Sequence, residues 1–141
     1  MIAPAVWLIL SGLALSVPRP NPARGPGEVI RLVVGALQRN DSPVPNAGVF
    51  TAYQFASPGN RAVTGPYGRF LQIVKSQESR PLMGQHAEEF GELMLHGDQA
   101  EQDVRVQPDQ GPAISYRFSV SRHTTGACAG CWLVDGVVRV R

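Results

Sequence analysis

The spacing of apolar residues changes near residue 85, and this change constrains the fold more than any other feature of the sequence. Before residue 85, apolar residues recur at the spacing of one helix face. After it, apolar and polar residues alternate, as in a strand with one buried face. Helices that all precede the strands exclude β-α-β crossovers, so the sheet is predicted to be antiparallel, with the helices on one face.

The first half predicts three helices, over residues 27–40, 46–55 and 65–75. One face of the first helix is apolar and carries Val29, Ile30, Val33, Val34 and Leu37. Asn46 and Thr64 are predicted to cap the second and third helices, because their side-chain oxygens can accept hydrogen bonds from first-turn amides. Ser57–Asn60 is predicted to form a turn between these two helices.

The second half predicts about four strands, over residues 90–95, 103–106, 113–121 and 132–140. The third has the clearest alternation, and Pro108–Gly111 before it is predicted to be a hairpin turn. Asp135-Gly136 interrupts the last strand, either as a tight hairpin or as a β-bulge. The predicted fold class is therefore α+β, with three N-terminal helices packed on a curved antiparallel sheet of about four strands.

Residues 1–17 are apolar and uncharged, and the proline-rich stretch 18–26 follows them. The apolar stretch is shorter than the roughly 20 residues of a spanning helix. It suits a secretory leader, and Ala14-Leu15-Ser16 resembles a cleavage site, although no Lys or Arg precedes it. We expect a leader, a stiff linker and one domain over residues 27–141. Export or membrane attachment through the leader is predicted, with a cytoplasmic protein as the alternative.

Composition and charge exclude some classes of protein. With 43% hydrophobic residues the chain can form a core, and its net charge of +2 is too small to indicate a nucleic-acid partner. The sequence contains no glycine-rich phosphate loop, no Ser-His-Asp order and no metalloprotease motif. We therefore predict no cofactor.

Three segments resemble an uncharacterised domain family of bacteria and photosynthetic lineages: EVIRLVVGALQRND at 28–41, FASPGNRAVTGPYGRF at 55–70 and CWLVDGV at 131–137. A closing pattern resembles the last two strands of the nuclear-transport-factor-2-like, or SnoaL-like, superfamily; it is carried by Tyr116, Phe118, Val120, Trp132, Asp135 and Val138. The resemblance covers about residues 27–140. It implies a cone of curved sheet around a long first helix, and no assigned activity.

The same resemblance implies a ligand pocket between the first helix and the sheet. Enzymes of the superfamily use an Asp base there with Tyr or Asp donors. The residues nearest that description are Tyr53, Tyr67, His86, Asp103 and Tyr116. For Tyr53 and Tyr67, packing in the core is the alternative. We predict a non-catalytic binding or accessory domain that pairs as a homodimer through its sheet face, with a small isomerase-type or hydrolase-type enzyme as the alternative.

Cys128 and Cys131 have the spacing of a dithiol pair. Buried thiols, a turn disulfide, half of a metal site and a redox pair all fit this spacing. A strand rather than a helix follows, which argues against a redox pair, because a helix N-terminus is what lowers a thiol pKa. A zinc site would need further ligands, for which only His86, His96 and His123 are candidates. We predict a structural pair without metal, oxidised if the chain is exported; a thiol-active protein is the remaining alternative.

Overall fold

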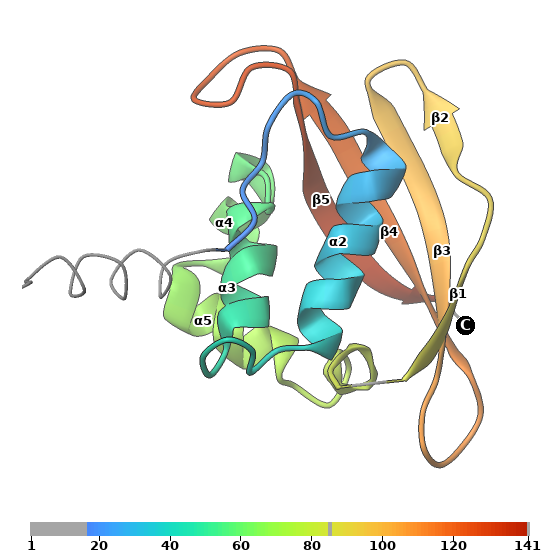
Figure 1. Cartoon of the computed structure of the whole chain (residues 1–141). Coiled ribbons are helices and arrows are strands. Elements are labelled where there is room, and N and C mark those ends of the chain that lie inside the picture. Colours follow the sequence, from blue (N-terminus) through green and yellow to red (C-terminus); the bar gives the residue numbers. More distant parts are fainter. Residues whose placement is uncertain (1–16, 85, 141) are drawn as a thin grey trace, which may run out of the picture.

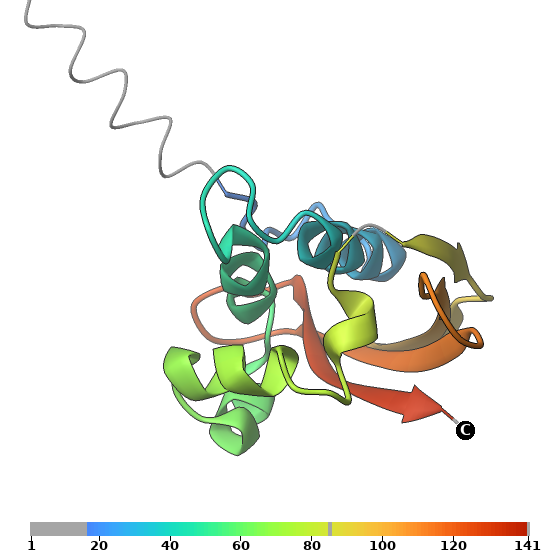
Figure 2. The same cartoon turned by 90° about the horizontal axis from the view of Figure 1, so that it is seen from below.

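The structure, a computed structural model, describes residues 17–84 and 86–140. Four α-helices come first along this part of the chain: α2 (Pro26–Gln38), α3 (Ala47–Gln54), α4 (Pro58–Thr64) and α5 (Tyr67–Val74). A 3₁₀ turn, η1 (Arg80–Leu82), leads to five strands: β1 (Ala87–Phe90), β2 (Met94–His96), β3 (Gln99–Gln107), β4 (Ile114–His123) and β5 (Cys131–Val140). Figures 1 and 2 show α2 lying across one face of an open antiparallel sheet, so the α+β class is confirmed.

The helix α2 has the buried face that the sequence predicts. Its first turn contains Pro26, where a missing N–H costs no helical hydrogen bond, and the Gly25 carbonyl accepts from the Val29 amide at 3.0 Å. The five predicted apolar residues of this helix are all 4% exposed or less. Burying such side chains contributes about 1.5–3 kcal/mol each, so this face holds α2 on the sheet.

The helices α2 and α3 approach most closely at Gly48. The Gly48 amide donates to the Asn40 carbonyl at 2.9 Å. A Cβ atom at position 48 would overlap the carbonyl oxygen of Ala36 and lie 2.8 Å from the Cα atom of Asn40. Only glycine lets the two backbones come this close.

The cap of α3 comes from Asn40, not from Asn46. Asn46 occupies the N-cap position, but its backbone is left-handed, with φ of 63°, and its side chain makes no capping bond. The Asn40 Oδ1 atom instead accepts from the Val49 amide at 2.9 Å, while Asn40 Nδ2 donates to Asn46 Oδ1 at 3.0 Å. The predicted side-chain cap by Asn46 is therefore wrong, because that oxygen is already bonded to Asn40.

A helix begins at the segment for which a turn is predicted. The Ser57 hydroxyl oxygen accepts from the Asn60 amide at 3.1 Å, and Pro58 fits the first turn of α4. Thr64 is the last residue of this helix, and its hydroxyl donates back to the Asn60 carbonyl at 2.9 Å, so it does not cap α5. Gly65, with φ of 84°, separates the two helices. The predicted count of three helices therefore becomes four in the described chain.

The strands follow the order β1-β3-β4-β5, and β2 also pairs with β3. The predicted single strand 90–95 is two short strands, because the chain leaves the ladder after Phe90 and rejoins it at Met94. Between them the Gly91 amide donates to the Asp103 carbonyl at 2.8 Å. The described sheet thus has five strands instead of about four.

A β-bulge bends the last strand. Val134 lies opposite Val120 and Gly136 lies opposite Ser119, which leaves Asp135 without a partner on β4. Of the two alternatives for Asp135-Gly136, the bulge is confirmed and the tight hairpin is wrong.

The connection between α3 and α4 lies beside β5. The Val134 amide donates to the Phe55 carbonyl at 2.7 Å, and the Val134 carbonyl accepts from the Ser57 amide at 2.9 Å. Ala56 forms a parallel bridge with Val134. These bonds fix the start of α4 against the sheet.

The proline-rich segment before α2 is not extended throughout. The Arg24 amide donates to the Asn21 carbonyl at 3.2 Å, which forms a turn. Within residues 17–84 and 86–140, no helix is long and apolar enough to cross a membrane. The predicted leader falls almost entirely on residues 1–16, which lie outside the described residues.

Candidate functional site

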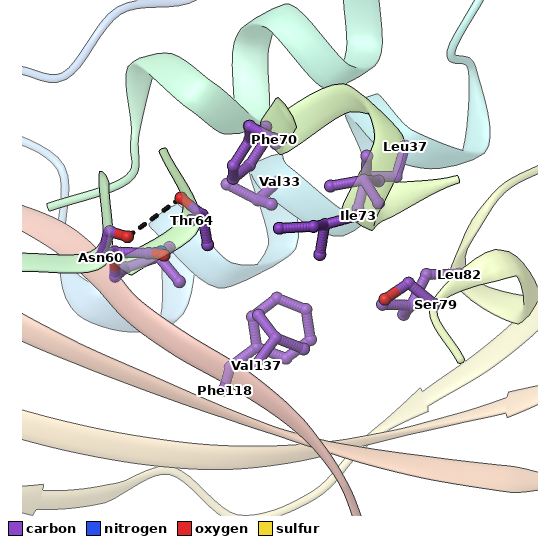
Figure 3. Close-up of a pocket in the computed structure, with 13 residues that line it drawn as sticks. Val33, Leu37, Asn60, Thr64, Phe70, Ile73, Ser79, Leu82, Phe118 and Val137 are labelled. Atoms are coloured by element: carbon purple, nitrogen blue, oxygen red, sulfur yellow. Dashed lines mark hydrogen bonds between the residues drawn. The ribbon is translucent and has the colours of Figure 1, made fainter. Parts of the chain in front are cut away.

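A cavity of about 110 Å³ lies between the helices and the sheet. It is lined by Val33, Leu37, Ala52, Asn60, Thr64, Phe70, Ile73, Val74, Ser79, Leu82, Phe118, Val134 and Val137. In Figure 3, Phe118 and Val137 form its wall on the sheet side, opposite Val33 and Phe70. Every layer of the fold therefore contributes to this one cavity.

The polar groups of the cavity are neutral and small. The Asn60 side-chain amide donates to the Val134 carbonyl at 3.0 Å, and the Thr64 hydroxyl donates to the Asn60 carbonyl at 2.9 Å (Figure 3). Ser79 lies beside Leu82 at the other end. Among the residues that the structure describes, none of the side chains that line the cavity is ionisable. The lining can hold an apolar group and offer hydroxyl or amide contacts at its ends.

Ile73 and Val137 mark the opening of the cavity. They are 37% and 38% exposed, whereas Phe118 on the same wall as Val137 is fully buried. A ligand would therefore enter between α5 and the second half of β5.

The short helix α4 positions the polar end of this cavity. The Ser57 cap starts the helix, and the Val134 carbonyl anchors both the Ser57 amide and the Asn60 side chain. Sequence reasoning missed Asn60, Thr64 and Ser79 as lining residues. A Ser-Pro pair is compatible with a helix start as well as with a turn, so the sequence allowed α4 without selecting it, and nothing in the sequence marks Ser79.

The structure brings together two of the five residues predicted for a pocket, Tyr53 and Tyr67. Their rings meet edge to face with centroids 5.4 Å apart, and Phe70 lies 5.2 Å from Tyr53. The Arg61 guanidinium stacks over the Tyr53 ring at 4.1 Å. Burial raises the pKa of Tyr67. The two tyrosines belong to an aromatic cluster beside the cavity and do not line it.

Tyr116 lies on the inner face of β4 but does not reach the cavity. Its hydroxyl donates to the Glu78 carbonyl at 2.7 Å, and the residue is 2% exposed. Burial raises the pKa of this hydroxyl above its usual value of 10.0. This hydrogen bond ties the chain before η1 to the sheet.

Asp103 and His86 lie in two further places. Asp103 is paired with Arg117 on the outer face of the sheet, with Oδ1 and Nε 2.8 Å apart, and this hydrogen bond lowers its pKa. The His86 Nδ1 atom lies 3.8 Å from Asp109 Oδ1 near the start of β1. The five predicted residues therefore occupy four separate places in the fold.

The outer face of the sheet is largely polar. Besides Asp103 and Arg117 it includes Glu101 and Ser119, and Val138 is its most exposed apolar side chain, at 59%. The pairing of two copies through this face stays a prediction.

Cys128 and Cys131 form a disulfide at the start of β5. Their Cα atoms are 5.5 Å apart, within the range that a disulfide requires, and Cys131 is fully buried. The loop they close packs beside the linker, since a Cβ atom at Gly130 would lie 3.3 Å from the Pro22 side chain. Across residues 17–84 and 86–140, no three His, Cys, Asp or Glu side chains group as metal ligands would.

Replacing both Cys128 and Cys131 with serine is expected to lower the free energy of unfolding by about 2 kcal/mol, because closing so short a loop constrains the unfolded chain only modestly. Urea unfolding of the two proteins measures the difference. A reducing agent should produce the same loss in the natural chain and none in the variant. A natural chain whose unfolding midpoint ignores the reductant would contradict the disulfide.

Comparison with known proteins identifies a family. Residues 27–141 match the model of the family described as Domain of unknown function (DUF4864). Searches of curated proteins and of solved structures gave no match. The matched residues contain α2 from its second residue onward, the other three described α-helices, all five strands and every residue that lines the cavity. The chain belongs to the DUF4864 family.

Proposed function

We propose that this domain is a non-catalytic module that binds a small apolar group in the cavity between α2, α5 and β5. The observation that carries the proposal is a cavity of about 110 Å³ with an apolar lining, neutral polar ends and an opening at Ile73 and Val137. Apolar cavities of similar size, about 150 Å³, stay dry and take up benzene. The bound group is therefore the size of a single ring or a short branched alkyl chain.

The chemistry of the lining supports a binding module over the alternative enzyme. General acid–base catalysis needs an ionisable group within hydrogen-bond reach of the substrate. The polar groups here are one amide and two hydroxyls, and the Asn60 and Thr64 donors are engaged with backbone carbonyls. The predicted candidate base, Asp103, is paired with Arg117 on the other face of the sheet.

Within this proposal the chain has the nuclear-transport-factor-2-like arrangement, with α2 lying in the hollow of the sheet. Support comes from the five buried residues of α2 and from the bulge at Asp135, which bends β5. The ligand cavity lies between the helices and the sheet, where that superfamily holds its ligands.

We also propose that the chain is exported or attached to a membrane through residues 1–17. The uncharged leader supports this, and so does the pairing of Cys128 with Cys131, because disulfides persist in oxidising compartments. Mass spectrometry of the mature amino terminus and thiol labelling of the natural protein test the two parts separately.

Benzene is the probe for the cavity. In ¹H–¹⁵N NMR spectra it is expected to shift signals around the cavity, including those of Asn60 and Phe118. Val33→Phe, whose larger side chain fills the space, should weaken this binding about tenfold or more, since a filled cavity leaves no room for the ring. The matched control is Val63→Phe, because Val63 is 79% exposed. Unchanged binding by Val33→Phe, or shifts confined to other surfaces, would refute the proposal.

A further inference from the structure

Exposed apolar side chains surround Val17, the first residue that the structure describes. Val17 lines a groove together with Val44, Pro45, Phe50 and Tyr67. Val44 and Phe50 keep 45% and 40% of their surface exposed, although the Phe50 ring packs edge-on against Tyr67 at 5.8 Å. We call these five residues the Val17 patch.

Basic side chains lie next to the Val17 patch. Arg19 follows it in the chain and is exposed, and exposed Arg39 lines a neighbouring groove that also contains Val17. The carboxylate of Asp41, in the loop after α2, accepts a hydrogen bond from the Asn46 amide at 3.0 Å. Apolar side chains beside arginines are typical of surfaces that lie at the headgroup level of anionic membranes.

The position of the leader connects this patch with lipid. Residues 1–16 are apolar and uncharged, and they join the domain at Val17. A leader held in a bilayer therefore brings the Val17 patch to the membrane surface before any other part of the domain. The cavity opens elsewhere, between Ile73 and Val137, so the two sites are separate.

We propose that the Val17 patch rests on an anionic lipid bilayer. Phe50 and Val44 insert at the boundary between headgroups and acyl chains, and Arg19 and Arg39 contact lipid phosphates. This inference rests on the proposed membrane attachment through residues 1–17 and not on the proposed ligand cavity.

Hydrogen exchange of the full chain tests the docking. The chain is placed in vesicles of phosphatidylcholine with phosphatidylglycerol, and in vesicles of phosphatidylcholine alone. The exchange of the amides of residues 46–50 should be slower by a factor of about five or more in the anionic vesicles than in vesicles of phosphatidylcholine alone. Added salt should reduce this protection, because it screens the arginines. Strand β2, with Leu95 57% exposed, is the internal reference and should not change.

Two double variants and one control variant separate the contributions to docking. The double substitution Val44→Ser, Phe50→Ser should remove the protection, whereas Leu95→Ser should retain it; Arg19→Ser, Arg39→Ser should remove the preference for anionic lipid. An unchanged exchange pattern in β3 and β4 shows that each variant is folded.

The outcomes distinguish the docking from the membrane attachment. Equal exchange of residues 46–50 with and without vesicles, in a chain that stays on the membrane, overturns the docking and keeps the attachment. Removal of residues 1–16 during export, with no vesicle binding by the mature chain, overturns both. Neither result affects benzene binding in the cavity, which is measured separately.

Discussion

Gly48→Ala adds a single methyl group and is expected to lower the free energy of unfolding of the domain by about 3 kcal/mol. The added Cβ would overlap the Ala36 carbonyl oxygen and crowd the Asn40 backbone. Both neighbours are main-chain atoms of α2 and its C-terminal extension, so a side-chain rotation cannot relieve the clash. The helices would have to separate, which also breaks the bond from the Gly48 amide to the Asn40 carbonyl. Chemical denaturation monitored by circular dichroism measures the loss.

Gly68→Ala provides the matched control. Gly68 is the second residue of α5, as Gly48 is of α3, and nothing lies within 4 Å of the Cβ it would gain. Alanine has the higher helix propensity, so this variant should gain up to about 1 kcal/mol. The close approach of α2 and α3 would be refuted if the two alanine variants were equally stable.

Asn40→Ala is expected to cost about 2–3 kcal/mol. Asn40 is 9% exposed, and its side chain joins the first turn of α3 to the Asn46 side chain. Alanine would leave the buried Val49 amide without its acceptor, and an unpaired buried donor carries the full cost of its desolvation. Thermal and urea unfolding of the variant should agree on the size of the loss.

Asn21→Ala tests whether this loss depends on burial. The Asn21 side chain also accepts a hydrogen bond from a backbone amide, that of Ala23 at 2.9 Å, but it is exposed. Water can replace the lost acceptor there, so the free energy of unfolding should change by no more than about 0.5 kcal/mol. If both asparagine variants lost the same stability, the capping role assigned to Asn40 would be wrong.

Elements with strong local periodicity could be predicted from the sequence. The helix α2 and the strand β4 each bury one face, and their apolar residues repeat at the matching spacing. The same alternation places Asp103 and Tyr116 on opposite faces, since Asp103 pairs with Arg117 while Val104 pairs with Tyr116. Two of the predicted pocket residues could therefore have been separated before the structure was known.

The rest of the helical half depends on partners distant in sequence. Ser57-Pro58-Gly59-Asn60 has the composition of a turn and equally that of a helix start. The choice is made by Val134, whose carbonyl accepts from both the Ser57 amide and the Asn60 side chain. No residue close to Ser57 in the sequence indicates this contact with Val134.

The candidate site was hard to predict for a related reason. Sequence motifs of catalytic and metal sites consist mainly of ionisable side chains, whereas this cavity is lined by apolar residues and by Asn60, Thr64 and Ser79. Small neutral residues of this kind form no sequence motif by which a binding site could be recognised. The space between them arises from the packing of α2, α5 and β5 together, and no single segment encodes it.

The bonds between Val134 and the start of α4 affect the order in which the chain can fold during synthesis. The acceptor of the Asn60 side chain is synthesised 74 residues after the donor. A nascent chain that has emerged only as far as β4 lacks this acceptor and the β5 wall on which the helices pack. The helical half therefore reaches its final packing only after β5 has left the ribosome. A chain truncated before Cys131 would leave apolar residues of its helices exposed to solvent. Such a chain is expected to aggregate.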